Sequence, residues 1–466
     1  MSAFVFTLSL LLFWGVLGFT VLSAIRRGRH ALESLLLAPL AGMFAVLLPS
    51  LWLNRLGLPV KTFAWPLAIV LLAAAALYLF TRRRGPVPLR AFFPFAVVVL
   101  TALLLVGRPM LEFGFNWVSY ANDDMATYVI IAQRFLHHGF FEYPTPEQIA
   151  HNLDMGVAYS WFMQVQAGER GGGELLVAIL SALSGLGTPV VYMPLTLAMY
   201  AALLLAASAL VLRSVNRRAA LLACILVSAS ALNTLGALYQ LMPQLAGLSS
   251  LAGCAAVMCR PVRFRSRAAL VRRGLLGAYF SAGLLIVYPE VLPFLGLSLL
   301  VYFAVAVIRG RQPIGPLFAW AGVAGAGTLV LVNQYILGVI VFLHLQLRGL
   351  QSDADLDISL FPFYLVPSGI TYFWGFLPIP RLSSDLVLTT LILAGTGLSL
   401  AALVAVVWQA LRGAAVASVA LVMCSLYFVL LSNRADFGLF KLAMFAQPFV
   451  LGTMAAAWTD YARRRR

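Results

Sequence analysis

The stretch VVYMPLTLAMYAALLLAASALVL, residues 190 to 212, contains no charged side chain, and the basic segment RSVNRR follows it at 213 to 218. Because an α-helix rises about 1.5 Å per residue, a run of this length matches the roughly 30 Å hydrocarbon core of a bilayer. Arginines directly after such a run are typical of the cytoplasmic end of a transmembrane helix. The stretch therefore predicts one membrane span, and similar stretches recur along the chain.

The composition of the whole chain agrees with this prediction. Of 466 residues, 62% are hydrophobic and 10% are charged, and the mean hydropathy is +0.94. A soluble globule of this size needs more polar surface than these residues supply. In lipid, helices satisfy their own backbone hydrogen bonds. We therefore expect an all-α, polytopic integral membrane protein with about 12 to 14 transmembrane helices.

Thirteen apolar runs are candidate spans. They cover residues 3 to 25, 31 to 54, 63 to 81, 91 to 107, 190 to 212, 219 to 238, 245 to 259, 274 to 289, 291 to 308, 315 to 345, 386 to 411, 414 to 431 and 439 to 458. These runs and the polar stretches between them divide the chain into five parts. The parts are N-terminal helices (1 to 107), an acidic loop (108 to 172), a central core (173 to 345), a second loop (346 to 385), and C-terminal helices with a basic tail (386 to 466).

Positive charge is concentrated between the spans. The net charge is +16, and arginine clusters recur at 26 to 30, 82 to 85, 213 to 218, 259 to 273, 309 to 311 and 463 to 466. This placement follows the positive-inside pattern of membrane proteins and argues against nucleic-acid binding. No basic residue precedes the first apolar run and arginines follow it, an order that favours a retained helix with an external N-terminus over a signal peptide.

The acidic residues fall on the opposite side in this topology. Eight of the sixteen carboxylates lie between Glu112 and Glu174, which includes the acidic loop. Long loops in compact proteins are usually functional, so this loop is the candidate active site. Two topologies stay open for the apolar segment 173 to 187. It is either re-entrant or only partly inserted, or it forms a full hairpin with 190 to 212 that puts the loop or the arginines of 260 to 273 on the unfavoured side.

Common soluble-enzyme motifs are absent from the sequence. It has no phosphate-binding P-loop, no HExxH zinc helix and no GxSxG elbow, so ATP-driven transport and the common hydrolase mechanisms lack support. The four cysteines have no CxxC spacing and are expected to be buried free thiols. They are Cys224, Cys254, Cys259 and Cys424.

Residues 124 to 138 have the pattern of an amphipathic helix lying at the membrane surface and ending at Gly139. The apolar arc contains Met125, Tyr128, Val129, Ala132, Phe135 and Leu136. The polar arc contains Thr127, Gln133, Arg134, His137 and His138, with Ile130 and Ile131 as exceptions. Asn122 or Asp123 can cap the first turn, and the helix dipole also favours Asp124 there. Capping explains one of the two carboxylates better than it explains both.

An acidic pair at the start of such a helix, followed by Tyr128, Ala132 and Gly139 in the first large external loop, resembles membrane glycosyltransferases of the GT-C fold. The segment RGGGELLVAILSALSGLG, 170 to 187, looks like the second helix of that module. The resemblance covers about residues 110 to 212. Three additional spans precede the loop, and Arg170 with the glycines replaces the usual proline-rich connection. The resemblance implies a GT-C-like fold and a polyprenyl-phosphate-linked sugar donor.

By this resemblance, Asp124 or Asp123 is the general base that takes the proton of the acceptor hydroxyl in an inverting single displacement. Cations on the same side would bind the departing phosphate. Arg434 and Lys441 are candidates because positive charge there opposes the topological bias. Arg170 and Arg348 are further candidates.

The stretch VYPEV places Glu290 at the boundary of a span, where it either caps a helix or is functional. We assign Glu290, Tyr288, Tyr128 and Gln244 to a pocket for the acceptor. The spacing of Asp353, Asp355 and Asp357 is similar to a calcium loop but lacks its glycine and distal glutamate. Adjacent His137 and His138 cannot reach one metal from a helix. No dedicated metal site is predicted, and a divalent cation as cofactor stays open.

The resemblance implies a glycosyltransferase in the bacterial inner membrane, with its site facing the periplasm or exterior. Its expected partners are a polyprenyl-phosphate sugar, a glycan or lipid acceptor and membrane lipids. Two alternatives stay open. One is an envelope glycan polymerase or ligase that uses lipid-diphosphate substrates. The other is a transporter or flippase of lipid-linked saccharides, although we find no internal repeat of the kind that transporters often have.

Overall fold

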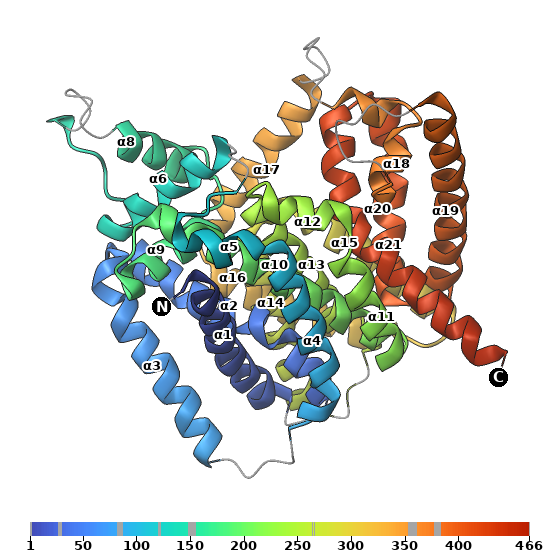
Figure 1. Ribbon diagram of the computed structural model, residues 1–466. Helices are drawn as coiled ribbons and strands as arrows, with labels where there is room; N and C mark the ends of the chain where they lie inside the picture. Colours follow the sequence, from blue (N-terminus) through green and yellow to red (C-terminus); the bar gives the residue numbers. More distant parts are fainter. Residues whose placement is uncertain are drawn as a thin grey trace.

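The computed structural model describes residues 2–26, 30–81, 87–119, 123–147, 155–262, 264, 266–352, 361–376 and 384–465. Every regular element in these ranges is helical, which confirms the predicted all-α class (Figure 1). Within them, eleven helices are long and apolar enough to cross a membrane, or twelve if one bent pair is a single span. The chain is thus a multi-pass membrane protein, and its eleven or twelve candidate spans among the described residues lie below or at the lower end of the predicted 12 to 14.

The eleven candidate spans agree with most of the predicted runs. They are α1 (Ala3–Arg26), α2 (Ala31–Arg55), α3 (Val60–Thr81), α4 (Leu89–Val106), α10 (Thr188–Ser214), α14 (Arg267–Val287), α15 (Leu292–Ile308), α16 (Ile314–Val332), α19 (Asp385–Leu411), α20 (Ala415–Ser432) and α21 (Asp436–Arg464). The shorter helices are α5 (Arg108–Phe113), α6 (Asp123–His137), α8 (Met155–Trp161), α9 (Gly172–Ser184), α11 (Arg217–Ser228), α12 (Ala231–Leu238), α13 (Met242–Met258), α17 (Tyr335–Ser352) and α18 (Gly369–Trp374). Short 3-10 or π-helical turns are η1 (Gly114–Asn116), η2 (Phe162–Gln166), η3 (Pro289–Val291) and η5 (Pro362–Leu365).

Two predicted spans are interrupted. The single span 315 to 345 was wrong, because α16 ends before Asn333, whose φ of 55° is left-handed, and α17 starts a new helix. The span 219 to 238 is the pair α11 and α12, bent by 54°. At that bend the amide nitrogen of Leu232 donates to the side chain of Gln447 over 3.1 Å, so a tertiary contact satisfies the freed backbone.

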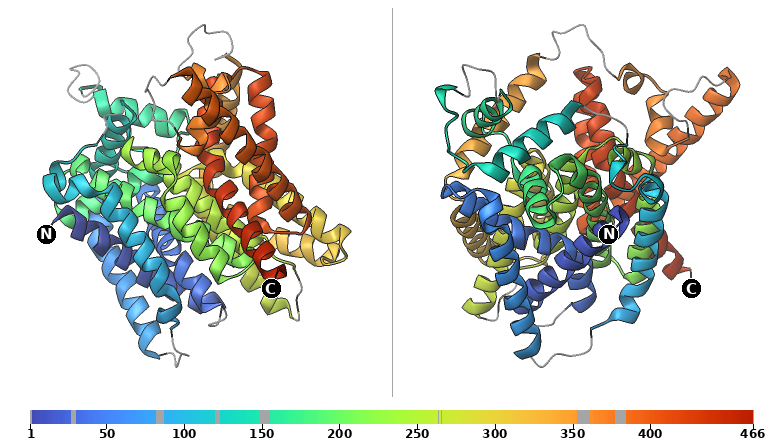
Figure 2. Two further views of the ribbon diagram at one scale, coloured as in Figure 1. Left: turned by 45° about the vertical axis from the view of Figure 1, so that its right-hand side comes forward. Right: turned by 60° about the vertical axis from the view of Figure 1, so that its left-hand side comes forward.

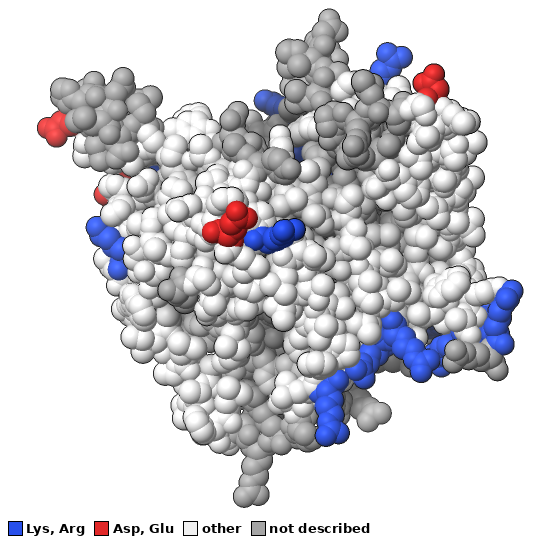
Figure 3. All heavy atoms as spheres, in the orientation of Figure 1, with Lys and Arg blue, Asp and Glu red and all other residues white. Residues whose placement is uncertain are grey.

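One end of the bundle is basic. Glu33 in the first turn of α2 forms ion pairs with Arg26, over 3.2 Å, and with Arg260. Arg273 donates to the carbonyls of Arg260 and Pro261, each over 2.7 Å. We call the end that carries Arg26, Arg213, Arg260 and Arg273 the arginine end. In Figure 3 a row of Lys and Arg side chains follows the lower edge, and the Asp and Glu side chains visible on this face lie in its upper half.

The opposite end carries α6, α8 and η2, and we call it the site end (Figures 1 and 2). Helix α9 has thirteen residues and is shorter than the candidate spans, and it packs against α6. It begins beside the C-terminal turn of α14, because a Cβ on Gly172 would meet the carbonyl oxygen of Ile286 at 2.6 Å. A non-crossing α9 removes the topological conflict: the acidic loop and the arginines of 260 to 273 then lie at opposite ends.

Helix α10 forms the centre of the bundle. In its most apolar window 94% of the residues are buried, and it packs against α1, α2 and α4 from one half of the chain and α13, α20 and α21 from the other. In Figure 1, α3 lies at one flank of this core and α19 at the other. A helix that is apolar on all faces is expected in such a position.

Helices α1 and α2 cross at two glycines. A Cβ on Gly18 would meet the carbonyl oxygen of Ala38 at 1.9 Å, and one on Gly42 would meet that of Trp14 at 1.8 Å. We expect Gly42→Ala to destabilise the protein by about 1 to 3 kcal/mol because the helices must separate. Thermal unfolding in detergent measures the loss. Gly15→Ala is the matched control, since no atom lies within 4 Å of its added methyl group. Equal stability of the two variants would contradict this packing.

Candidate functional site

The predicted surface helix forms as α6 and lies at the site end (Figure 1). Its apolar arc faces inward as predicted, with Tyr128, Ala132 and Phe135 buried. Ile131, an exception in the predicted pattern, is also fully buried. Because α6 packs on α9, α8 and α3, the inward face of the helix is covered by protein.

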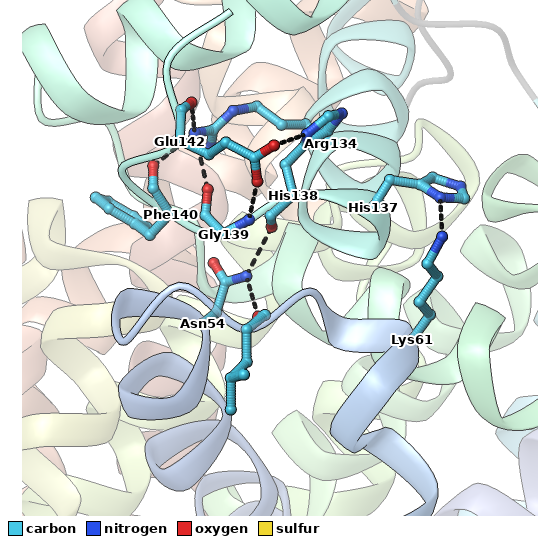
Figure 4. A network of polar contacts seen from close by, with 9 residues as sticks. Asn54, Lys61, Arg134, His137, His138, Gly139, Phe140 and Glu142 are labelled. Atoms are coloured by element: carbon cyan, nitrogen blue, oxygen red, sulfur yellow. Dashed lines mark hydrogen bonds and ion pairs between the residues drawn. The ribbon is translucent and has the colours of Figure 1, made fainter.

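Arg134 corrects the predicted polar arc. Arg134 is 1% exposed, and its Nη2 donates to the carbonyl oxygens of Gly139, Phe140 and Glu142 over 3.2, 2.5 and 3.3 Å (Figure 4). The chain after α6 folds back over this side of the helix, so a position that the helical period assigns to the polar arc becomes buried. Burial lowers the pKa of Arg134 to about 10, which keeps the guanidinium charged at neutral pH.

The end of α6 is attached to the end of α2. Asn54 donates through its side-chain Nδ2 to the carbonyl oxygen of His138 over 2.9 Å (Figure 4). The backbone carbonyl oxygen of Asn54 accepts from the Phe140 amide over 2.9 Å. The Arg55 guanidinium lies 4.7 Å from the ring centroids of both Phe140 and Phe141. Helix α6 ends just before Gly139, close to the predicted position.

The two histidines contact different polar partners. His137 Nδ1 lies 3.2 Å from Lys61 Nζ, and His138 Nδ1 lies 2.8 Å from a carboxylate oxygen of Glu142 (Figure 4). The His138 bond and the Gly139 amide lower the pKa of Glu142 against the opposing effect of burial. Among the described residues no group of three or more His, Cys, Asp or Glu side chains could hold a metal ion.

Replacing Arg134 is expected to loosen the chain after α6. Arg134→Gln removes the donor that serves three carbonyl groups, so we expect a loss of about 1 to 3 kcal/mol in the free energy of unfolding. Hydrogen exchange of the backbone over residues 139 to 143 should rise above that of the wild type. Gln133→Ala on the exposed face of the same helix is the control. Unchanged exchange in Arg134→Gln would show that these hydrogen bonds do not hold the segment.

A buried network of charged and aromatic groups lies beneath α6. Arg170 Nη1 contacts Glu290 Oε1 over 2.5 Å, and its Nη2 donates to the hydroxyl of Tyr128 over 3.1 Å. The guanidinium lies 4.9 Å from the ring centroid of Tyr288. Four predicted site residues therefore lie together, although they come from α6, the loop before α9, the end of α14 and η3. They are Tyr128, Arg170, Tyr288 and Glu290. With Glu169 and Glu174 they form what we call the Arg170 cluster.

The sequence prediction missed Glu174, which lies in the first turn of α9 and is 0% exposed. Neither of its carboxylate oxygens accepts a hydrogen bond from another described residue. Glu169 Oε2, Arg170 Nε and Glu290 Oε2 are likewise buried without a hydrogen-bond partner in the described part of the chain. Such a concentration of unsatisfied groups at one place indicates a site for water or a polar ligand. A carboxylate inside the apolar segment 173 to 187 was the available signal.

Glu174 gives the cluster a group that titrates near neutral pH. Burial raises its pKa to about 8 against the opposing effect of Arg170. Burial also raises the pKa of Glu169 and of the Tyr128 hydroxyl. In the folded protein Glu174 therefore carries a proton at pH 7, whereas the unfolded chain would release it.

This difference predicts a pH dependence of stability. A carboxyl whose folded pKa lies above its ordinary value of 4.5 destabilises the fold progressively as the pH rises through that interval, to about 8. We expect the melting temperature to fall over this range and Glu174→Gln to flatten the slope. Glu147→Gln, at an exposed position, should retain the wild-type slope. An unchanged slope in Glu174→Gln would contradict the assignment.

Asp124 lies in the first turn of α6, one helical turn before Tyr128, and is exposed. Its charge reaches the cluster, because it contributes to the raised pKa values of Tyr128 and Glu169. Helix α6 begins at Asp123, and the predicted cap is Asn122 or Asp123. Asn122 and the side chain of Asp123 lie outside the described residues. The result is an exposed carboxylate close to a buried ionic network.

The other predicted residues are dispersed around this centre. Gln244 is buried in the first turn of α13, and a Cβ on Gly247, one turn later, would meet the Tyr288 ring at 2.5 Å. Lys441 lies 4.3 Å from the Phe437 ring centroid on α21. Arg434 has a φ of 51° in the turn before α21, and Arg348 is exposed near the end of α17. Asp353, Asp355 and Asp357 lie outside the described residues.

Comparisons with protein-family models, with curated proteins and with solved structures found no match. The chemical properties of this region are those of the Arg170 cluster and of Asp124. Two properties of this region matter most. One is an exposed carboxylate beside a buried network, and the other is the position of both at the end of a membrane bundle.

Proposed function

We propose that this protein is a membrane glycosyltransferase that moves a sugar from a polyprenyl-phosphate donor to an acceptor hydroxyl at the site end. The observation that carries the proposal is the placement of exposed Asp124 one helical turn from Tyr128, which contacts the buried Arg170. The resemblance of this acidic helix to the GT-C loop supports the same assignment. The donor's lipid would remain in the bilayer while its sugar is presented beside α6.

Asp124 acts as the general base in this mechanism and takes the proton of the acceptor hydroxyl as that oxygen attacks the anomeric carbon. The bond to the lipid phosphate breaks in the same displacement, which inverts the anomeric centre. Arg170 is held by Glu290 and Tyr128, so its role is to orient groups around the acceptor rather than to supply a free positive charge. Gln244 and Tyr288 would complete the wall of the acceptor pocket.

The departing phosphate requires cations, and the proposed ones are Arg434, Lys441 and Arg348. Arg434 and Lys441 lie at the start of α21, and its other end carries Asp460, which pairs with Arg412. Four residues after Arg412, the Val416 amide donates to Ser214, next to Arg213 of the arginine end, over 3.2 Å, so the start of α21 belongs to the site end. By the positive-inside rule the arginine end would face the cytoplasm and the site end the periplasm or exterior of a bacterial inner membrane. The separation of charge between the two ends supports this orientation.

The direct test uses purified protein in detergent micelles with a labelled polyprenyl-phosphate sugar and a hydroxyl acceptor. An enzyme releases polyprenyl phosphate and forms the glycosidic bond without a second compartment. Lipid-diphosphate-linked saccharides are assayed in parallel, because their consumption would favour the polymerase or ligase instead. Movement of intact lipid-linked saccharide across a vesicle, with no bond broken, would overturn the proposal.

Transport is the second candidate, and Glu174 is the observation that favours it. Buried ionisable groups within membrane bundles often form proton relays or ion pathways. In reconstituted vesicles, a proton-coupled transporter would carry protons when lipid-linked saccharide is added, and Glu174→Gln would stop that flux. An enzyme would show sugar transfer with no such proton movement.

A further inference from the structure

Four arginines surround one carboxylate at the arginine end, far from the Arg170 cluster. Arg26 and Arg260 contact Glu33 directly. Arg273 holds the carbonyl of Arg260, and Arg213 lies within electrostatic range of Glu33 and Arg260. Because Glu33 neutralises one of the four positive charges, about three remain within a partly buried space.

Helix dipoles do not offset this surplus. The C-terminal ends of α1, α10 and α13 lie here, and each is followed in the chain by the N-terminal end of α2, α11 or α14. The partial negative charge of each C-terminus is therefore matched by the partial positive charge of an N-terminus. The first turn of α2 also has no side-chain cap, because His30 precedes it in a left-handed conformation with φ of 61°. The positive charge therefore has no protein counterpart beyond Glu33 among the described residues.

Several donors in this space are unused. The Arg26 side chain is 6% exposed, and its Nε is buried without a hydrogen-bond partner in the described part of the chain. Arg213 forms no hydrogen bond or ion pair with any described residue. Burial lowers the pKa of Arg260 to about 9; Glu33 opposes this shift, and Arg26, Arg213 and Arg273 reinforce it. A bound anion would relieve the repulsion and satisfy these donors.

We infer that the arginine end holds a binding site for a phosphate group, formed by Arg26, Arg213 and Arg260 with Glu33 setting its net charge. Arginine forks match the oxygens of phosphate, and about three surplus charges suit a group that carries one or two negative charges. Basic pockets between membrane helices bind phospholipid headgroups in this way. The group belongs either to an anionic lipid or to a soluble phosphate compound, and it is separate from the sugar-transfer site.

Arg213→Gln is the most informative substitution because no described contact depends on this side chain. The matched control is Arg218→Gln, which removes the same charge from an exposed position at the same end. Glu33→Gln should have the opposite effect, since Glu33 is the one carboxylate among the described residues that contacts these arginines. If Glu33 served only to hold Arg26 and Arg260, its loss would not increase affinity for an anion.

The experiment has two arms, both with the full-length protein. In detergent, inorganic phosphate is titrated at constant ionic strength and binding is followed by the rise in melting temperature. In nanodiscs of phosphatidylcholine with or without phosphatidylglycerol, native mass spectrometry counts retained anionic lipids. We expect Arg213→Gln to weaken binding about tenfold in at least one arm, as loss of one charge-assisted hydrogen bond predicts. Arg218→Gln should leave it unchanged, and Glu33→Gln should strengthen it.

A response in the phosphate arm assigns the site to soluble phosphate compounds, and a response in the nanodisc arm alone assigns it to a lipid headgroup. Equal binding by Arg213→Gln and Arg218→Gln would overturn the inference, because attraction would then be a property of the whole basic surface. Absence of binding in both arms would overturn it as well. Neither result bears on sugar transfer at the opposite end.

Discussion

Replacing Asp124 by asparagine should lower the rate of sugar transfer by about 10² to 10⁴ while leaving the protein folded, because a positioned general base contributes that much to catalysis. Asparagine keeps the size of the side chain and loses its basicity. Asp124 is exposed in the first turn of α6, where the interaction of its charge with the helix dipole is worth about 0.3 to 1 kcal/mol. Initial rates with a labelled lipid-phosphate sugar measure the change, and size-exclusion chromatography checks the fold.

Two controls separate chemistry from charge. Glu112→Gln removes an exposed carboxylate on α5, before the acidic helix, and should transfer sugar at the wild-type rate. Asp123→Asn should have the smaller effect if Asp124 is the base, and the larger one if the two roles are exchanged. Full activity in both single variants and in the double variant would exclude these aspartates from the reaction.

Arg170→Gln should be the most destabilising substitution in the site, by about 3 to 5 kcal/mol, because it leaves the largely buried carboxylate of Glu290 without its partner. The two side chains are 9% and 18% exposed and lie 2.5 Å apart. Tyr128 would lose a hydrogen-bond partner at the same time. Denaturant or thermal unfolding of the purified protein gives the free energy of unfolding.

A double-mutant cycle isolates this ion pair. Arg170→Gln with Glu290→Gln should cost less than the sum of the single changes, since no uncompensated charge remains. Arg412→Gln tests a more exposed pair, in which Arg412 and Asp460 are 28% and 27% exposed, and should cost about 1 kcal/mol or less. Additive effects at Arg170 and Glu290 would mean that the two groups do not stabilise each other.

Hydropathy predicted the bundle because lipid imposes length and apolarity on every span. It failed where tertiary contacts replace helical hydrogen bonds. The polar pair Asn333 and Gln334 was the signal for the break after α16, and the small residues Ser228, Ala229 and Ser230 mark the bend after α11. At the bend a partner more than two hundred residues later, Gln447, completes the backbone bonding, and no local pattern reveals such a contact.

The candidate site was predicted in part for a similar reason. Periodicity located the inward face of α6 and pointed to Tyr128. Arg170 was a candidate because it is a cation on the same side as the acidic loop, and Glu290 because it interrupts apolar sequence at the boundary of a span. The burial of Arg134 depends on how the chain returns after Gly139, which helical period does not describe. Glu174 was missed because a carboxylate in the first turn of a helix is common, since the helix dipole favours it there. Only its surroundings show that this one is buried without a hydrogen-bond partner among the described residues.

The central helix α10 also bears on the order of assembly during synthesis. It is made before α13, α20 and α21, so three of its covering neighbours do not exist when the ribosome delivers it. Between Thr188 and Leu212 α10 has no charged side chain, and the hydroxyls of Thr196 and Ser208 donate to carbonyls of the helix itself, so it can stay in lipid until these neighbours are made. The hydroxyls of Tyr192 and Tyr200 gain their acceptors, the carbonyls of Gln240 and Ser228, only when those residues follow. For Gln447 on α21 the order is reversed, because its hydrogen-bond partner at the bend, the Leu232 amide, has already been synthesised when α21 is made. The chain thus synthesises the central helix α10 early, and the polar side chain of Gln447, which fixes the bend between α11 and α12, late.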